Sequence, residues 1–297
     1  MPQSPSLRSP RGLGVAAMAL CALLWSLAGL FIKFIDWNPF AIACGRSAIA
    51  ALFIWIWVRK PRFTFSTPQL LAALSNAATM LLFIYANKAT TSANAILLQY
   101  GSPIYVAIIG AIVLKEKPRA EHWAALVFVA LGMGLFFMNV PLEGRSIGGG
   151  SLPGNIAAAA AGLTFALYSI FMRMQKDGSP VESALLSHLI TAPVAFVACL
   201  FLPAPKMSPA SIAAILGLGV LQIGLASVLF SAGIKRITAI DANIIGVIEP
   251  VFNPVWVFLF IGEKPGANAL LGGAVIIAAV LVSTMVGLRR ERKSALG

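Results

Sequence analysis

Ten apolar segments alternate with short polar connections along nearly the whole chain. Each is close to the roughly 20 residues that a helix needs to cross a hydrocarbon core about 30 Å thick. The pattern predicts an all-α polytopic membrane protein with ten transmembrane helices. The approximate bounds of the segments are Leu13–Ile35, Phe40–Val58, Gln69–Asn87, Ala93–Leu114, His122–Val140, Asn155–Gln175, Val181–Leu202, Ala210–Gly233, Asp241–Ile261 and Ala267–Leu288.

The composition excludes a soluble globular domain. Hydrophobic residues make up 59% of the chain, charged residues 11%, and the mean hydropathy is +0.89. Soluble domains carry about 25% charged residues. The three cysteines, Cys21, Cys44 and Cys199, lie inside apolar segments. We expect them to behave as small hydrophobic residues, not as a disulfide or a metal site.

The basic residues divide unequally between the two sides of the predicted bundle. Sixteen of the 22 Lys and Arg residues fall at the chain ends and in the connections of one side, five fall on the other side, and Arg46 lies inside the second segment. The positive-inside rule then places both termini in the cytoplasm. This distribution also accounts for the net charge of +12 without a nucleic-acid partner.

One stretch of the chain occurs twice, 147 residues apart. Residues Ala93–Pro118 align without a gap on Ile240–Pro265, so that Pro103 matches Pro250 and both copies end in Glu-Lys-Pro. Extending the alignment pairs Lys88 with Lys235 and Thr91 with Thr238. A fixed period of this kind indicates a duplicated architecture.

Five helices per copy is an odd number, so the second copy enters the membrane with the opposite orientation. Inverted repeats of this kind are typical of secondary transporters. The sequence thus predicts two five-helix repeats joined by a Gly-rich linker and flanked by basic tails. The predicted boundaries are 1–12 for the N-terminal tail, 13–140 for the first repeat, 141–153 for the linker, 154–288 for the second repeat and 289–297 for the C-terminal tail.

Several of these features resemble the drug/metabolite transporter superfamily and, more narrowly, its EamA-type exporters. They are the Leu-Leu-Trp-Ser at 23–26, the lone Arg46 after Asn38-Pro39, and the IEPVFNPVWVFLFIGEKP sequence that ends the ninth segment. The chain is most similar to the aromatic amino-acid exporters of Gram-negative bacteria. The resemblance implies an exporter of amino acids or related metabolites in the bacterial inner membrane.

Aromatic and neutral polar residues inside the segments predict an amphipathic substrate cavity. An indole or phenol in the membrane interior requires a polar partner or water. Trp25, Tyr100 and Tyr168 fall inside their segments, and helix packing is the alternative role for each. The predicted substrate-binding residues are Trp25, Asn76, Thr79, Met80, Phe83, Tyr85, Gln99, Tyr100, Thr164, Tyr168, Gln222, Asn243 and Glu249.

Three ionisable residues lie within the predicted membrane segments. Arg46 is either a counter-charge for a substrate carboxylate or a structural residue. Glu249 either binds an amine or a coupling proton, or braces the kink at Pro250. His188 is either a proton relay or a packing residue.

Paired prolines near the middle of the fourth and ninth segments predict two hinges. Proline removes a backbone hydrogen bond and kinks a helix. Pro103 with Gly101, and Pro250 with Gly246, occupy corresponding positions in the two repeats. We expect bending there to open and close the two gates.

The sequence favours secondary transport over other functions. It contains no P-loop, so we expect no ATP drive and no cofactor, and its two histidines suggest no metal site. An intramembrane enzyme would have only His188 and Glu249 as a catalytic pair, and paired kinks argue against a channel. The predicted cargo is amino acids, large neutral and aromatic ones above all. The alternative is export of other small metabolites or amphipathic drugs.

Overall fold

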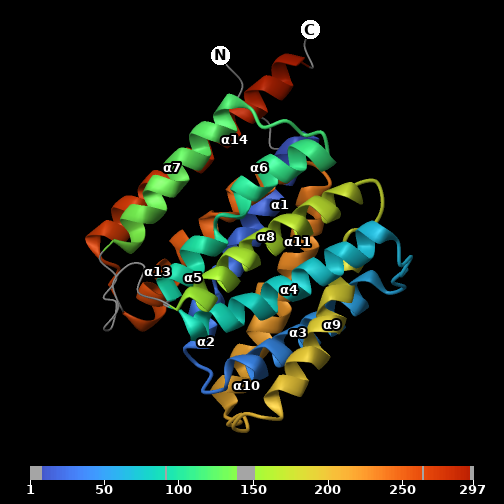
Figure 1. Ribbon diagram of the computed structural model, residues 1–297, viewed down its shortest axis with the longest axis vertical. Coiled ribbons are helices and arrows are strands. Elements are labelled where there is room, and N and C mark those ends of the chain that lie inside the picture. Colours follow the sequence, from blue (N-terminus) through green and yellow to red (C-terminus); the bar gives the residue numbers. More distant parts are fainter. Residues whose placement is uncertain (1–8, 91, 139–150, 263, 295–297) are drawn as a thin grey trace.

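The computed structural model describes residues 9–90, 92–138, 151–262 and 264–294. Every regular element in these ranges is helical (Figure 1). The elements are α1 (Pro10–Trp25), α2 (Ala28–Ile32), α3 (Pro39–Val58), α4 (Thr67–Ala89), α5 (Ser92–Gln99), α6 (Ser102–Val113), α7 (Ala120–Phe137), α8 (Leu152–Met174), α9 (Val181–Cys199), α10 (Pro209–Gly217), the π-helix η1 (Leu218–Leu225), α11 (Ala226–Ile234), α12 (Ala239–Gly246), α13 (Ile248–Ile261) and α14 (Ala267–Ser294).

Ten spans of the described chain are long and apolar enough to cross a membrane, which confirms the predicted number. Six spans are single helices. The other four are composite, namely α1 with α2, α5 with α6, α10 with η1 and α11, and α12 with α13. The composite spans matter for function because interrupted helices leave backbone polar groups that only protein or a polar cavity can satisfy.

Polar caps followed by proline start several of the spans. Ser9, Asn38 and Ser208 each accept a hydrogen bond from a backbone N–H of the first turn, and proline follows each directly. The cap satisfies one of the free N–H groups of the helix. Proline is tolerated at the first position because an N–H there would have no acceptor within the helix. These local signals fix where the helices begin.

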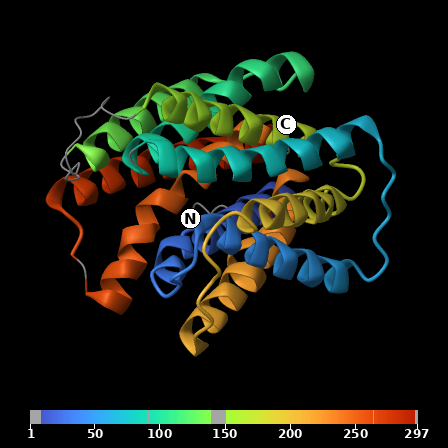
Figure 2. The ribbon, with the colours of Figure 1, turned by 60° about the horizontal axis from the view of Figure 1, so that its bottom comes forward.

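The helices form one bundle in which segments distant in sequence lie side by side. α4 packs along α8, α1 packs against α11, and α7 lies beside α14 at one edge of the bundle (Figure 1). Figure 2 shows α13, in orange, extending away from the neighbouring helices before the chain turns back into α14. The main hydrophobic core is formed mostly by residues of α1, α6, α7, α8, α11, α12 and α14.

The positions of the helix ends define two faces of the bundle. We call the end at which α1 begins and α14 ends the terminal face, and the other end the opposite face. α14 continues to Ser294, so the described part of the predicted basic tail, residues 289–294, is helical. α8 begins at Leu152, one residue before the predicted end of the linker at 153. Residues 139–150 of that linker lie outside the described residues.

Candidate substrate cavity

A cavity of about 290 Å³ lies among the composite spans, with α3, α4 and α8 completing its wall. Both halves of the chain contribute to it. Its lining consists of Trp25, Ala28, Gly29, Ile32, Arg46, Asn76, Thr79, Met80, Phe83, Asn87, Ile96, Gln99, Tyr100, Ser102, Phe165, Tyr168, Gln222, Ile223, Ser227, Asn243, Gly246, Glu249, Pro250 and Asn253.

The cavity extends towards the opposite face and ends well short of the terminal face. Ile32 is the last residue of α2, and Asn87 lies in the last turn of α4, both at the opposite face. In the other direction, the lining residues Tyr168 and Ser227 lie about two helical turns before the ends of α8 and α11. The cavity is thus asymmetric about the middle of the bundle.

A break between α1 and α2 shapes one wall of the cavity. The Ser26 hydroxyl donates to the Leu23 carbonyl at 2.6 Å and accepts from the Trp256 indole N–H at 2.8 Å. The Gln222 amide lies 3.5 Å from the Trp25 carbonyl. A Ser side chain that bonds its own backbone competes with the helical ladder. Partners from α13 and η1 therefore stabilise the interruption at Ser26.

Two further breaks face each other in α5–α6 and α12–α13. The first helix of each pair ends at Gln99 or Gly246, and the second begins at Ser102 or Ile248. Pro103 and Pro250 lie in the first turn after each break. Neither proline has the N–H with which a continuous helix would bond the carbonyl four residues earlier.

Four aromatic side chains form the floor of the cavity on the side of the terminal face. The ring centroids of Trp25 and Phe165 are 5.8 Å apart in an edge-on arrangement. Tyr168 stacks on Phe230 at 5.3 Å, and Phe230 lies 5.6 Å from Trp25. Phe230 is buried behind the other three, which line the cavity. This aromatic floor offers ring faces and edges to an apolar or aromatic group.

Two opposite charges lie on the cavity wall. Glu249 of α13 lies beside the Tyr100 hydroxyl, and the Arg46 guanidinium of α3 is close enough to interact electrostatically with its carboxylate. Arg46 Nε is buried and has no hydrogen-bond partner among the described residues. An arginine inside a membrane protein is costly unless it meets protein, water or a ligand. The cavity can therefore bind an anionic and a cationic group together.

Amide oxygens add acceptor capacity near Glu249. Asn243 donates through Nδ2 to the Ala239 carbonyl at 3.0 Å, and its Oδ1 has no partner in the described part of the chain. Gln222 Oε1 is also buried without a hydrogen-bond partner in that part of the chain. Buried acceptors without a partner cost about 1–3 kcal/mol each. A ligand or water that donates hydrogen bonds would relieve this cost.

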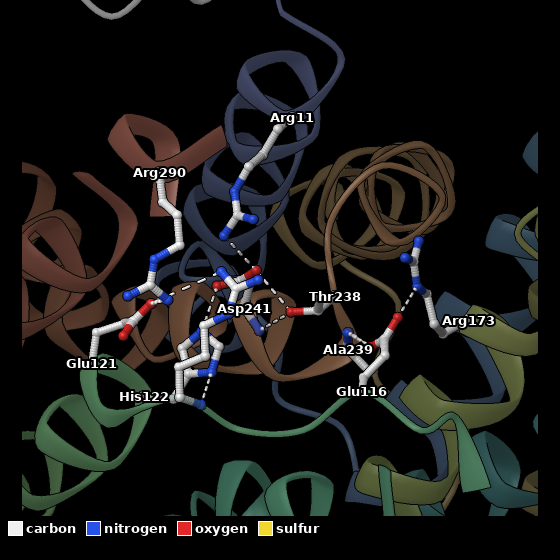
Figure 3. Close-up of polar contacts among 10 residues, drawn as sticks. Arg11, Glu116, Glu121, His122, Arg173, Thr238, Ala239, Asp241 and Arg290 are labelled. Carbon is white, nitrogen blue, oxygen red and sulfur yellow. Dashed lines mark hydrogen bonds and ion pairs between the residues drawn. The ribbon is translucent and has the colours of Figure 1, made fainter. Parts of the chain in front are cut away.

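Between the aromatic floor and the terminal face lies a network centred on the first turn of α12 (Figure 3). Asp241 Oδ2 accepts from Arg11 at 2.8 Å and from the Thr238 hydroxyl at 2.7 Å. Its Oδ1 lies 3.2 Å from His122 Nε2. The Arg119 N–H donates to His122 Nδ1 at 3.2 Å, so the imidazole proton is on Nε2 and points at Asp241.

A second carboxylate binds the same helix start. Glu116 accepts from Arg173 Nε at 2.7 Å through one oxygen and from the Ala239 N–H at 3.0 Å through the other (Figure 3). Arg290 of α14 donates to Glu121 of α7 at 2.9 Å nearby. Acidic groups are favourable at a helix N-terminus. Five segments of the bundle are therefore tied together at the terminal face.

A family comparison identifies the class of protein. The model of the EamA-like transporter family matches residues 12–138 and 152–285. The chain belongs to the EamA-like transporter family. It is therefore a multi-pass membrane transporter of the drug/metabolite superfamily and not an enzyme, as the sequence predicts.

Individual relatives of this EamA-like transporter are distant. Two proteins of Archaeoglobus fulgidus, each described as an uncharacterized transporter, are 24% and 26% identical to it over 90% and 91% of the chain and 96% of their own lengths. The Pseudopaline exporter CntI of Pseudomonas aeruginosa is 26% identical over 80% of this chain and 82% of that protein. A known crystal structure with 20% identity aligns over 95% of the chain and 99% of its own length, with a TM-score of 0.80.

The structure of this EamA-like transporter brings most of the predicted substrate-binding residues to the cavity. Two of them lie elsewhere. Tyr85 is 48% exposed on the other side of α4, and Thr164 lies behind the wall, where it accepts a hydrogen bond from Thr79 at 2.8 Å. The residues that do line the cavity are Trp25, Asn76, Thr79, Met80, Phe83, Gln99, Tyr100, Tyr168, Gln222, Asn243 and Glu249.

Of the ionisable and hinge residues, Arg46, Gly246 and Pro250 line the cavity, whereas Gly101 and Pro103 border it from the α5–α6 break. His188 is fully buried behind the cavity, with Nε2 3.4 Å from the Ser227 hydroxyl. This position does not bring it to the cavity lining.

Other residues of the site escaped the sequence analysis. Asn87, Ser102 and Asn253 line the cavity, but the helical spacing did not distinguish them from other polar positions. The network around Asp241 was also missed. A buried acid beside the start of the ninth segment and a basic residue at the start of the first were the available signals.

Proposed function

We propose that this protein exports amino acids from the cytoplasm across the bacterial inner membrane, with aromatic and other large neutral ones preferred. The transport cycle alternates access to the cavity between the two membrane sides. The observation that carries the proposal is the joint presence of Arg46, Glu249 and the aromatic floor in one cavity.

A zwitterion matches this arrangement of charges. Its carboxylate would pair with the Arg46 guanidinium, including the unpartnered Nε. Its ammonium would donate to Glu249 and to the free oxygens of Gln222 and Asn243. Charge-assisted hydrogen bonds of this kind are roughly twice as strong as neutral ones. One positive and one negative group suit a neutral zwitterion better than a polyanion.

The aromatic floor supports a preference among amino acids. Trp25, Phe165 and Tyr168 line the end of the cavity that is nearer the terminal face. A large apolar side chain placed there would gain about 25 cal/mol per Å² of apolar surface removed from water. Small or charged side chains would gain less or would be disfavoured.

The alternative is export of other small metabolites or amphipathic drugs. The similarity to the Pseudopaline exporter CntI supports it. That relative is 26% identical to this chain, and its name gives pseudopaline as the cargo. Both alternatives use the same cavity, so the cargo itself has to be measured.

The test is uptake of labelled phenylalanine, methionine and leucine into liposomes that contain the purified protein. We expect saturable uptake, reduced about tenfold or more by Trp25→Ala and by Tyr168→Ala, because each removes part of the aromatic floor. Tyr85→Ala removes an aromatic residue of α4 that lies outside the cavity, and this variant should transport normally. An imposed pH gradient decides whether transport is coupled to protons.

Folded protein that moves none of these amino acids would overturn the proposal and favour the metabolite alternative. Equal losses in Tyr85→Ala and Tyr168→Ala would show that the aromatic floor does not select the cargo. Fluorescence-detected gel filtration of each variant separates loss of transport from loss of folding.

A further inference from the structure

We propose that six residues, Arg11, Glu116, His122, Arg173, Thr238 and Asp241, form a lock that holds the cavity closed at the terminal face. We call them the terminal-face lock. The inference depends on the transport function of the family and not on the identity of the cargo. It assigns to these residues the role of a gate, which must separate before the cavity can open at this face.

Both carboxylates of the lock are fully paired in the structure, whereas Arg11 Nε is buried with no partner among the described residues. All four carboxylate oxygens of Asp241 and Glu116 have a partner at 3.2 Å or less. The Asp241 and His122 side chains are only 6% and 5% exposed, and that of Arg11 is 14% exposed. Buried carboxylates whose oxygens all have partners hold a geometry firmly, because separating them leaves unpaired charge in a dry site.

The position of the lock makes it a gate and not only a brace. Its residues come from α1, the α6–α7 connection, the start of α7, the end of α8 and the start of α12, which converge in Figure 3. α1 and α12 each end at a helix break beside the cavity, at Ser26 and Val247. Elements bounded by such breaks can swing as rigid pieces.

Close packing between α1 and the α11–α12 connection seals the same region. A Cβ atom on Gly14 would lie 2.7 Å from the Cβ of Arg236, and one on Gly233 would lie 2.6 Å from Met18 Cγ. The helices approach this closely only because glycine has no side chain. No cavity-lining residue lies in this sealed layer.

The corresponding contacts at the opposite face are uncharged. In the repeat alignment Asp241 corresponds to Asn94, and Arg11 corresponds to Ser151 at an offset of 140. There the Thr90 hydroxyl donates to Asn155 Oδ1 at 2.7 Å, Asn94 Nδ2 lies 3.4 Å from the same oxygen, and Ser151 donates to the Ala89 carbonyl. An ionic lock at the terminal face and neutral contacts at the repeat-related positions of the opposite face favour a resting state closed at the terminal face.

Cys21 provides a native reporter for the test. It lies on α1 between the lock and Trp25, is fully buried, and donates through Sγ to the Ala226 carbonyl. In a Cys44→Ser/Cys199→Ser background, a membrane-impermeant maleimide is applied from each side of oriented vesicles. Met18→Cys, in a background that also carries Cys21→Ser, places a second thiol one turn nearer the lock.

We expect slow labelling of both thiols in the parent protein. Asp241→Asn should raise the rate from the side of the terminal face about tenfold or more, by shifting the population towards the open state. The double variant Arg11→Ser/Asp241→Asn copies the residues of the opposite face and leaves neither member of the pair as an unpaired buried charge. It should label as fast as the single variant.

Asp36→Asn is the control, because its ion pair with Lys206 at 2.9 Å is exposed at the opposite face. It should label like the parent. Parent-like labelling of both thiols in the double variant, with the protein folded by gel filtration, would overturn the lock. Faster labelling in the control as well would also overturn it, since the effect would then not belong to these residues. Neither result depends on amino-acid uptake, so failure of the lock and failure of the proposed cargo are separate findings.

Discussion

At the scale of single residues, the cavity combines two charges with an otherwise apolar and aromatic lining. A charged side chain at the centre of a membrane helix costs on the order of 2.5–3.5 kcal/mol on insertion scales. Arg46 and Glu249 each incur such a cost, and the Tyr100 hydroxyl and the charge of the other residue offset part of it. Their placement in the cavity wall is what a zwitterionic cargo would use.

Replacing Glu249 by Gln tests the cationic half of this site. Gln keeps the size of the side chain, but it carries no charge. We expect the KM for phenylalanine to rise about tenfold or more, because a hydrogen bond to a charged group contributes about 1.5–3 kcal/mol. The measurement is initial uptake rate against concentration in proteoliposomes. An unchanged KM would assign Glu249 to bracing the α12–α13 break.

Helical spacing explains which of the predicted substrate-binding residues line the cavity. Asn76, Met80 and Phe83 share one side of α4 and line the cavity. Tyr85 is two residues from Phe83, and a rotation of 100° per residue turns it outward. Thr164 lies close to the cavity, but a hydrogen bond with Thr79 holds it behind the wall. Helical spacing gives the direction of a side chain around the helix axis too coarsely to separate a lining residue from its neighbour.

At the scale of elements, the breaks in three spans and the π-helix in a fourth shape the cavity. Proline and glycine in corresponding repeat positions predicted the interruptions beside Gly101 and Gly246. The interruption at Ser26 carries no proline, and it depends on Trp256 and Gln222 from other spans. The π-helix η1 likewise has no local signal in the sequence. Such breaks arise from tertiary contacts, which sequence patterns do not report.

Replacing Pro250 by Ala tests whether the α12–α13 break acts as a hinge. Alanine restores the N–H that can bond the Gly246 carbonyl and favours a continuous helix. We expect transport to slow while binding of the cargo is retained, since only the conformational step should change. Labelled-substrate binding and uptake are compared on the same preparation. Normal transport by this variant and by Pro103→Ala would contradict the hinge assignment.

The α7–α14 pair offers a matched test of helix packing. A Cβ on Gly132 would lie 2.7 Å from Ile276 Cγ1 and 2.9 Å from the Gly272 carbonyl oxygen, whereas nothing lies within 4 Å of a Cβ on Gly134. We expect Gly132→Ala to reduce stability by about 1–3 kcal/mol, the usual cost of overpacking. Gly134→Ala should not reduce it. Thermal unfolding in detergent compares the two, and equal losses would contradict this packing.

At the scale of the whole molecule, hydropathy alone predicts ten membrane-spanning helices, and the described part of the chain contains ten such spans. The contacts at the terminal face cannot be predicted in the same way. Arg11 and Asp241 are 230 residues apart in sequence and meet only in the folded bundle. Neither periodicity nor the repeat alignment brings them together. The family and the fold can thus be predicted from the sequence, whereas the asymmetry of the cavity requires the structure.

Charge distribution predicts how the bundle sits in the membrane. The positive-inside rule predicts that the terminal face lies in the cytoplasm. In that orientation the cavity would extend towards the outer side. We expect a C-terminal green fluorescent protein fusion to fluoresce and a C-terminal alkaline phosphatase fusion to be inactive, since each enzyme or fluorophore matures on one side only. The reverse pair of results would place the terminal face, and the lock with it, on the outer side of the membrane.

The most direct test of the proposed function is competition for binding of labelled phenylalanine to the purified protein. Phenylethylamine lacks the carboxylate, and 3-phenylpropionate lacks the ammonium, while both keep the aromatic ring. If Arg46 and Glu249 bind the two ends of a zwitterion, unlabelled phenylalanine competes and each analogue competes about tenfold or more weaker. Analogues that compete as well as phenylalanine would show that the cavity recognises the ring alone, and the zwitterion account would be wrong.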